Sequence, residues 1–215
     1  MTSIVVLVLA SLPIALVIHE WKHKDHKIVE IVQKKMFNPK NIRSNLSFMG
    51  SSAEGILYSV LWPILLFLVL DNFEKIGFLN TFSFLASSVT VLIIGRYIDK
   101  HGTKLVHGVG VILNTLLYIP RMIFANPYLF YGLDVADRLI MGTYNLPRMS
   151  LAYKKARKRG GSDYFIFREL SYHAGAIIGV SISLIALQFI SNWKLLFALT
   201  MIGSLLGYFI ETEED

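Results

Sequence analysis

Seven ionisable side chains fall inside or at the ends of long apolar stretches, where a charge is costly and usually has a partner or a function. Glu54 lies in the small-residue run Gly50–Gly55 and has no evident cation on its own helix. A carboxyl group in that setting can exchange a proton or bind a cation or a solute, which is the chemistry of a coupled transport site. The candidate coupling or substrate residues are Glu54, Asp134, Asp137, Arg138, Arg168, Glu169 and His173.

Two groups among these residues have the spacing of one helical face. Asp134 and Arg138 are four apart, so we expect them to neutralise one another and to leave Asp137 for a proton, a cation or another helix. Glu169 and His173 are also four apart, but they lie within about one turn of a basic segment. Long side chains at such a place reach the membrane interface, so structural pairing is the alternative for this second group.

A second pattern, His19-Glu20-Trp21-Lys22-His23, fits His-Glu-x-x-His, the helix signature of zinc peptidases. Two histidines four apart share a helical face and can bind zinc, with the glutamate between them as general base. Lys22 and Lys24 crowd this position with positive charge, and so short a pattern arises easily by chance. An intramembrane zinc protease is therefore a minor alternative, and we expect a protein that is not an enzyme, with no metal and no cofactor.

The elements that must position these residues are apolar segments of membrane-spanning length. The chain has 215 residues, of which 54% are hydrophobic and 17% charged, whereas soluble domains are about 25% charged. There is no cysteine, which excludes disulfides and thiol chemistry. Runs this long and apolar are helices, because lipid leaves an open backbone no other partner. The sequence predicts an all-α integral membrane protein with seven transmembrane helices: Ile4–Ile18, Leu46–Leu70, Ile76–Ile94, Leu105–Ile123, Pro127–Leu146, Phe165–Ile190 and Leu195–Ile210.

The distribution of Lys and Arg predicts the orientation. Sixteen of the 21 lie in three segments, residues 19–44, 95–104 and 148–164. By the positive-inside rule these segments are cytoplasmic, with the N-terminus outside and the acidic C-terminus inside. We expect a multi-pass protein of the cell membrane (plasma or inner membrane).

Three parts are expected: a leading helix at 1–18, a basic cytoplasmic linker at 19–44 and a six-helix bundle at 45–215. Within the linker, Ile28, Ile31, Val32 and Met36 fall on one helical face. This pattern predicts a short helix lying on the inner leaflet and ending at Asn38-Pro39. A solvated basic linker is the alternative.

A short charged turn joins the apolar runs Ile76–Ile94 and Leu105–Ile123. Its residues resemble the loop signature of the major facilitator superfamily of transporters, Gly-x-x-x-Asp-Arg/Lys-x-Gly-x-Lys/Arg, which joins the second and third helices of each half. The resemblance implies that the turn is a conformational latch, whose aspartate engages the other half in one state and releases it in the other. The matching positions are Gly95, Asp99, Lys100, Gly102 and Lys104.

The order of the predicted elements extends the resemblance over nearly the whole chain. One helix is followed by a long basic loop and then by six helices, with the signature between the second and third of those six. The chain thus resembles helix six, the central linker and the C-terminal half of a twelve-helix carrier. The resemblance implies alternating-access transport of a small solute, with no nucleic-acid partner, completed by a second half or by self-association.

A lone half would expose to lipid the face that normally lines the central cavity, with Glu54 and possibly Asp137 on it. This mismatch is the main physical argument from the sequence for a partner, since charges facing lipid are costly. The natural partner of Asp99 would also lie in the half that this chain lacks. The alternative is a truncated membrane remnant that does not transport and has a structural or assembly role.

Overall fold

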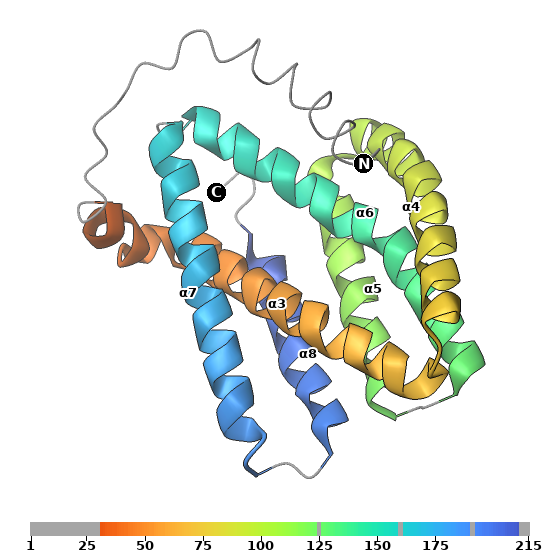
Figure 1. The fold of residues 1–215 in the computed structure, drawn as a ribbon. Helices are drawn as coiled ribbons and strands as arrows, with labels where there is room; N and C mark the ends of the chain where they lie inside the picture. Colours follow the sequence, from red (N-terminus) through yellow and green to blue (C-terminus); the bar gives the residue numbers. More distant parts are fainter. Residues whose placement is uncertain (1–30, 124–125, 159–160, 190–191, 211–215) are drawn as a thin grey trace, which may run out of the picture.

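The computed structural model describes residues 31–123, 126–158, 161–189 and 192–210, and within these ranges it contains helices and no strands (Figure 1). The predicted span Ile4–Ile18 and the motif His19-Glu20-Trp21-Lys22-His23 lie outside the described residues. Short helical turns at Val32–Met36, Pro39–Asn41, Trp193–Leu196 and Gly207–Phe209 flank the main helices. The α-helices are α3 (Ile42–Leu70), α4 (Phe73–His101), α5 (Thr103–Ile123), α6 (Pro127–Lys158), α7 (Ser162–Ala186) and α8 (Phe197–Leu206).

Helices α3 to α8 correspond in order to the last six predicted spans. By length and composition α3, α4, α5 and α7 can each cross a membrane. Helix α6 is longer, but Asp134, Asp137 and Arg138 interrupt its apolar stretch, and the apolar helix at Lys194–Phe209 is shorter. The prediction of an all-α membrane protein is therefore confirmed.

Two predicted connections are more helical than expected. The charged turn at 95–104 is helical as far as His101, and α5 begins at Thr103. The break is confined to Gly102, whose φ of 86° lies in the region that favours glycine. The expected loop 148–164 is likewise helical as far as Lys158, because lysine and arginine are good helix formers and hydropathy reports lipid contact rather than helix.

In chain order the bundle consists of two three-helix units, α3–α5 and α6–α8, whose helices pack more across the units than within them. The first helix of each unit packs mainly on the other unit: α3 lies against α7 and α8, while α6 lies against α4 and α5. Helices α5 and α8 also contact each other. Helices α3 and α6 run in opposite directions (Figure 1). Two inverted three-helix repeats of this kind form one half of a major facilitator transporter.

Small residues allow the helices of the two units to cross closely. A Cβ atom added at Gly175 of α7 would fall on the backbone of Met49 in α3. One added at Gly203 of α8 would lie 2.7 Å from the carbonyl oxygen of Gly50 in α3. Because lipid tails are as apolar as the helices, this close van der Waals contact is a main source of association between them.

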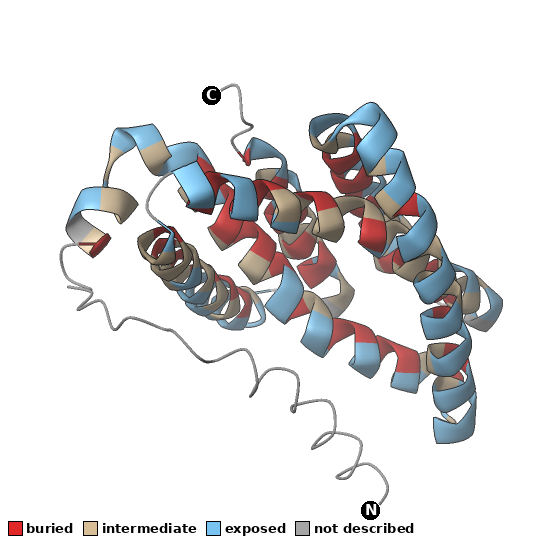
Figure 2. Cartoon of the chain, turned by 90° about the horizontal axis from the view of Figure 1, so that it is seen from above, coloured by how far each residue is buried: buried red, intermediate tan, exposed pale blue. Residues whose placement is uncertain are grey.

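Buried residues collect on the faces that the helices turn toward one another (Figure 2). At one end of the bundle, Ile31 is buried in a cluster with Phe48, Tyr164 and Phe167, and Met36 packs against it. Thus the apolar face predicted to lie on the leaflet packs, in its described part, on the protein. The short helical turn ends at Met36, next to the expected boundary. The end of the bundle that carries this cluster, Gly102 and Lys158 is called the basic end below.

Candidate functional site

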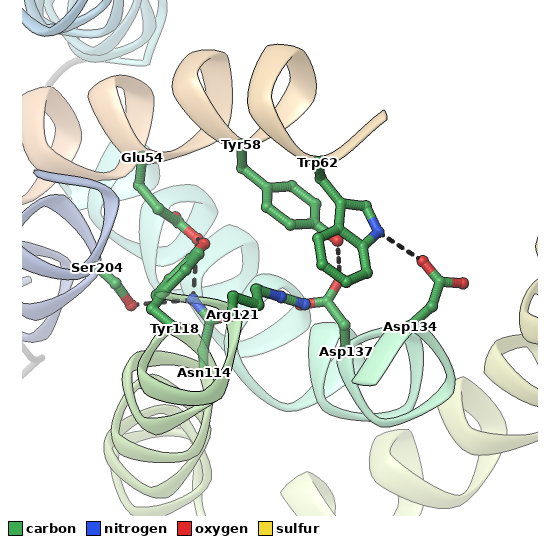
Figure 3. Close-up of polar contacts among 9 residues, drawn as sticks. All are labelled: Glu54, Tyr58, Trp62, Asn114, Tyr118, Arg121, Asp134, Asp137 and Ser204. Carbon is green, nitrogen blue, oxygen red and sulfur yellow. Dashed lines mark hydrogen bonds and ion pairs between the residues drawn. The ribbon is translucent and has the colours of Figure 1, made fainter. Parts of the chain in front are cut away.

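Two polar stripes on otherwise apolar helices meet inside the bundle. On α3, Glu54, Tyr58 and Trp62 follow one another at intervals of four, so they share one helical face. On α5, Asn114, Tyr118 and Arg121 lie at the intervals of four and three that also mark one face. Figure 3 shows the two stripes pointing toward each other, with carboxylates of α6 and Ser204 of α8 completing the group. The contacts of this buried polar network come from both three-helix units.

Glu54 lies at one side of the network and is 6% exposed. Its Oε1 accepts hydrogen bonds from the hydroxyl of Tyr118 at 2.6 Å and from Nδ2 of Asn114 at 2.9 Å (Figure 3). The same Asn114 amide donates to Oγ of Ser204 at 2.9 Å. The carboxyl group is thus held by neutral donors and has no ion pair among the described residues. At a rise of about 1.5 Å per residue it lies roughly 18 Å along α3, near the middle of that helix.

Arg121 lies at the centre of the network and is fully buried, with 0% exposure. Its Nη2 is 3.0 Å from Oδ1 of Asp137, and the other oxygen of that carboxylate accepts a hydrogen bond of 2.9 Å from Tyr58. The guanidinium carbon lies 4.8, 4.4 and 5.1 Å from the ring centroids of Tyr58, Trp62 and Tyr118. A cation so enclosed is stabilised by one carboxylate and by the negative faces of aromatic rings.

Asp134 completes the network on the side away from Glu54. Its Oδ1 accepts a hydrogen bond of 2.8 Å from Nε1 of Trp62, while its Oδ2 is buried without a partner in the described part of the chain. Oδ1 of Asn114 and both Nε and Nη1 of Arg121 are also buried and unpartnered within that part. Buried polar atoms nearly always have partners, so this network has more hydrogen-bonding capacity than the described contacts use.

The network holds more acidic than basic groups. Glu54, Asp134 and Asp137 are each at most 6% exposed, and Arg121 is the single cation in contact with them among the described residues. The network thus has an excess of acidic groups at membrane depth, where a charge without a partner is costly. No cluster of three His, Asp or Glu side chains suited to a metal ion occurs in the described ranges.

The expected pairing of Asp134 with Arg138 is wrong. Although four residues apart, the two side chains reach different helices, because α6 lies between α4 and the polar stripe of α3. Asp134 bonds Trp62 on α3, whereas Arg138 lies 3.5 Å from Oδ1 of Asn80 and 4.2 Å from the ring centroid of Phe84, both on α4. Asp137, expected to be left for a proton, a cation or another helix, is paired with Arg121 of α5.

The third predicted group lies apart from the network, near the start of α7 at the basic end. Nε of Arg168 is 3.0 Å from Oε1 of Glu169, and its guanidinium carbon lies 5.2 Å from the ring centroid of Phe165. Glu169 and His173 are both exposed. Glu169 therefore pairs with its neighbour in sequence and not with the histidine four residues on.

The signature residues also lie at the basic end, at the junction of α4 and α5. Asp99, Lys100 and Lys104 are exposed, and Asp99 makes no side-chain hydrogen bond or ion pair with another described residue. A Cβ atom added at Gly95 would meet no atom within 4 Å, so that glycine is not required by packing within this chain. The distance along α5 from Lys104 to Arg121 is about 26 Å, so the signature residues and the buried polar network are separate.

The expectation that Glu54 and Asp137 face lipid in a lone half is also wrong. Both are buried between helices of this chain, at 6% and 4% exposure. The inverted packing of α3 and α6 turns their polar faces inward, toward α5 and α8. Exposure of these carboxylates is therefore no argument for a second half.

Sequence reasoning missed the most buried cation in the structure. Arg121 lies two residues before the end of the predicted span Leu105–Ile123, beside Pro120, and is not among the candidate residues named from the sequence. The signal that could have identified it is the polar stripe Asn114, Tyr118 and Arg121 on α5. Polar residues at helical spacing within a membrane span mark a face turned to protein and not to lipid.

An all-helical bundle of membrane-spanning helices with a network of buried charges defines a multi-pass membrane protein. The chain belongs to the Major Facilitator Superfamily: residues 46–214, which contain α3 after its first turn and all of α4 to α8, match the model of that family. Members of this superfamily are membrane transporters of small solutes rather than enzymes. No curated protein and no solved structure matches the chain.

Proposed function

We propose that this chain is one half of a secondary transporter, which moves a small solute by alternating access together with a second six-helix half. The observation that carries the proposal is the pair of inverted three-helix units, α3–α5 and α6–α8, within the region that matches the family. In this superfamily a carrier contains two such halves, and its solute site lies between them near the middle of the bilayer. The second half is supplied by another chain or by a second copy of this one.

Support for a second half comes from the helices at the edge of the bundle. Helices α4 and α7 occupy equivalent places in the two inverted units, and they are the least buried of the membrane-spanning helices. Each therefore presents a broad face on which a second half can pack. Asp99, exposed at the basic end without a described partner, is suited to the latch role implied by the signature.

The buried polar network is the proposed coupling site. It holds three carboxyl groups and one arginine, which pairs with Asp137, so binding of a proton reduces the cost of keeping the other carboxyl groups in the membrane. Glu54 is the strongest candidate for the proton-binding group, because it bonds only neutral donors while Asp137 is paired with Arg121. Proton binding there alters the bonds that join α3 to α5, and through Ser204 to α8.

The test begins with the tagged full chain, purified from its native membrane in mild detergent with whatever co-purifies. The complex is placed in liposomes that contain a trapped pH-sensitive dye, and solutes are screened for proton movement that depends on the solute. A second six-helix chain in equal amount, or a dimer, together with solute-dependent proton flux is the expected result. A monomer without flux for any solute would leave the non-transporting remnant as the better account.

Glu54→Gln then tests the coupling site. The amide keeps an oxygen that can accept from Tyr118 and Asn114, but it cannot bind and release a proton. We expect this variant to fold and assemble while its solute-dependent proton flux falls at least about tenfold, as is common when a positioned acid–base group is lost. Glu74→Gln, the same change at an exposed position of α4 outside the network, is the matched control and retains the flux. Unchanged flux in Glu54→Gln would exclude this residue as the coupling group.

A further inference from the structure

Two adjoining hollows lie at the basic end, between the junction of α4 and α5, the last part of α6 and the turn that follows α8. The larger has a volume of about 900 Å³ and the smaller about 330 Å³. Lys104, Gly108 and Tyr208 line both, so the two form one continuous groove. Neither hollow includes a residue of the buried polar network.

The end of this groove at the start of α5 is basic. His101, Lys104 and Lys154 line the larger hollow, where Asp99 is the single acidic residue among the described ones, and Arg43 lines the smaller hollow. The lysines come from different helices, α5 and α6, and converge on one space. The groove also receives Thr103, the first residue of α5, where backbone N–H groups and the positive end of the helix dipole favour an anion.

The opposite side of the groove is apolar and follows one face of α5. Leu105, Val109 and Ile112 stand at intervals of four and three along the helix and are 54%, 49% and 51% exposed. Gly108 leaves space between α5 and Tyr208, since a Cβ atom there would lie 3.2 Å from the ring of Tyr208. From Lys104 to Ile112 the strip is about 12 Å long, which fits within one leaflet of a hydrocarbon core of about 30 Å.

We propose that this groove binds one anionic phospholipid. The phosphate of the headgroup lies between Lys104 and Lys154 at the start of α5, and an acyl chain lies along Leu105, Val109 and Ile112. The groove is basic at one end and apolar along the strip. A phospholipid likewise has an anionic headgroup at one end followed by apolar acyl chains. Basic pockets between transmembrane helices at a cytoplasmic surface bind anionic headgroups for the same reason.

The experiment measures binding of single lipids to the purified full chain in detergent by native mass spectrometry. Phosphatidylglycerol is compared with phosphatidylcholine of the same acyl chains, with inorganic phosphate in a parallel titration. We expect the first phosphatidylglycerol to bind more tightly than phosphatidylcholine. A lysine near a membrane surface changes affinity for an anionic lipid about fivefold, so Lys104→Gln and Lys154→Gln should each weaken phosphatidylglycerol by about that factor.

Two further variants distinguish a defined lipid-binding site from nonspecific electrostatic attraction of anionic lipid to this end of the protein. Arg157→Gln/Lys158→Gln removes two exposed cations of the last turn of α6 that do not line the groove, and we expect it to leave the affinity of the first lipid unchanged. Val109→Trp keeps every charge and fills the apolar strip from an exposed position, so it should weaken phosphatidylglycerol at least fivefold.

Three results would overturn the proposal. Equal loss in the Arg157/Lys158 control would show that charge at this end of the protein acts without a defined site. Unchanged binding in Val109→Trp would show that no chain lies on the strip. Displacement of phosphatidylglycerol by millimolar inorganic phosphate would make the groove a site for free anions. Circular dichroism of each variant confirms that a loss of binding is not a loss of fold.

Discussion

Replacement of Arg121 by methionine tests whether the buried network holds the bundle together. Methionine matches much of the length of arginine but leaves the carboxylate of Asp137 buried without its cation, which lies 3.0 Å away in the structure. The three aromatic rings around the guanidinium would keep their packing and lose their cation–π contacts. The perturbation is therefore mainly electrostatic.

The expected cost follows from the burial of both partners. Removing one member of a buried ion pair costs about 3–5 kcal/mol, because the other charge stays in a poorly polar environment. Asp137 keeps the hydrogen bond from Tyr58, so we expect about 3 kcal/mol for Arg121→Met. The double variant Arg121→Met/Asp137→Asn removes both charges and should lie within about 1 kcal/mol of the parent, since replacing a whole buried pair is often nearly neutral. The double variant should then be about 2–3 kcal/mol more stable than Arg121→Met alone.

The measurement is unfolding of the purified chain in detergent micelles by added sodium dodecyl sulfate, followed by tryptophan fluorescence and circular dichroism. Arg138→Met is the matched control, because that arginine is only partly buried and its polar contact, to Asn80, is 3.5 Å long. We expect the control to cost about 1 kcal/mol or less. The reasoning would be refuted by an Arg121 variant as stable as the control, or by a double variant no more stable than the single one.

Two shorter predictions concern packing and orientation. Gly175→Ala should destabilise the bundle by about 1–3 kcal/mol in the same unfolding assay, because α3 and α7 must separate; Gly55→Ala, with no atom within 4 Å of the new Cβ, should cost nothing. The chain has no cysteine, so single cysteines can be labelled without background. In intact cells an impermeant maleimide should label Lys75→Cys and not Lys158→Cys; the reverse pattern would invert the proposed orientation.

The sequence was sufficient to predict the helices but not all of their ends. Long apolar runs locate α3 to α8 because lipid imposes helix on any chain that crosses it. The end of α6 was placed at Leu146 and lies at Lys158, twelve residues further on, because the helix continues beyond its apolar stretch. Only Gly102 breaks the junction of α4 and α5, since it alone there has a positive φ.

The candidate site was predicted in part, because rules of residue spacing relate side chains on one helix and not side chains on different helices. Their position within apolar runs singled out the carboxyl groups of Glu54, Asp134 and Asp137, which the structure buries. The spacing of four residues paired Asp134 with Arg138, whereas the structure pairs residues of different helices. The partner of Asp137 is sixteen positions away on α5, and no local pattern relates them. Tertiary packing determines which helix faces meet. Here the first helix of each three-helix unit packs on the other unit, which no local pattern indicates.

The buried network can serve helix packing, transport or both. The double variant distinguishes these roles, whereas a single substitution would affect both. Apolar packing could hold these helices at lower cost than three carboxyl groups and one arginine, so a purely structural network would be expected to tolerate neutral replacement. In the proposed transporter, Arg121→Met/Asp137→Asn therefore regains the stability that Arg121→Met loses but not solute-dependent proton flux, because the charged pair that belongs to the same network as Glu54 has been removed. Parental stability with parental flux would mean that the pair serves only to pack the helices. Parental stability with lost flux would place Arg121 and Asp137 in the transport machinery.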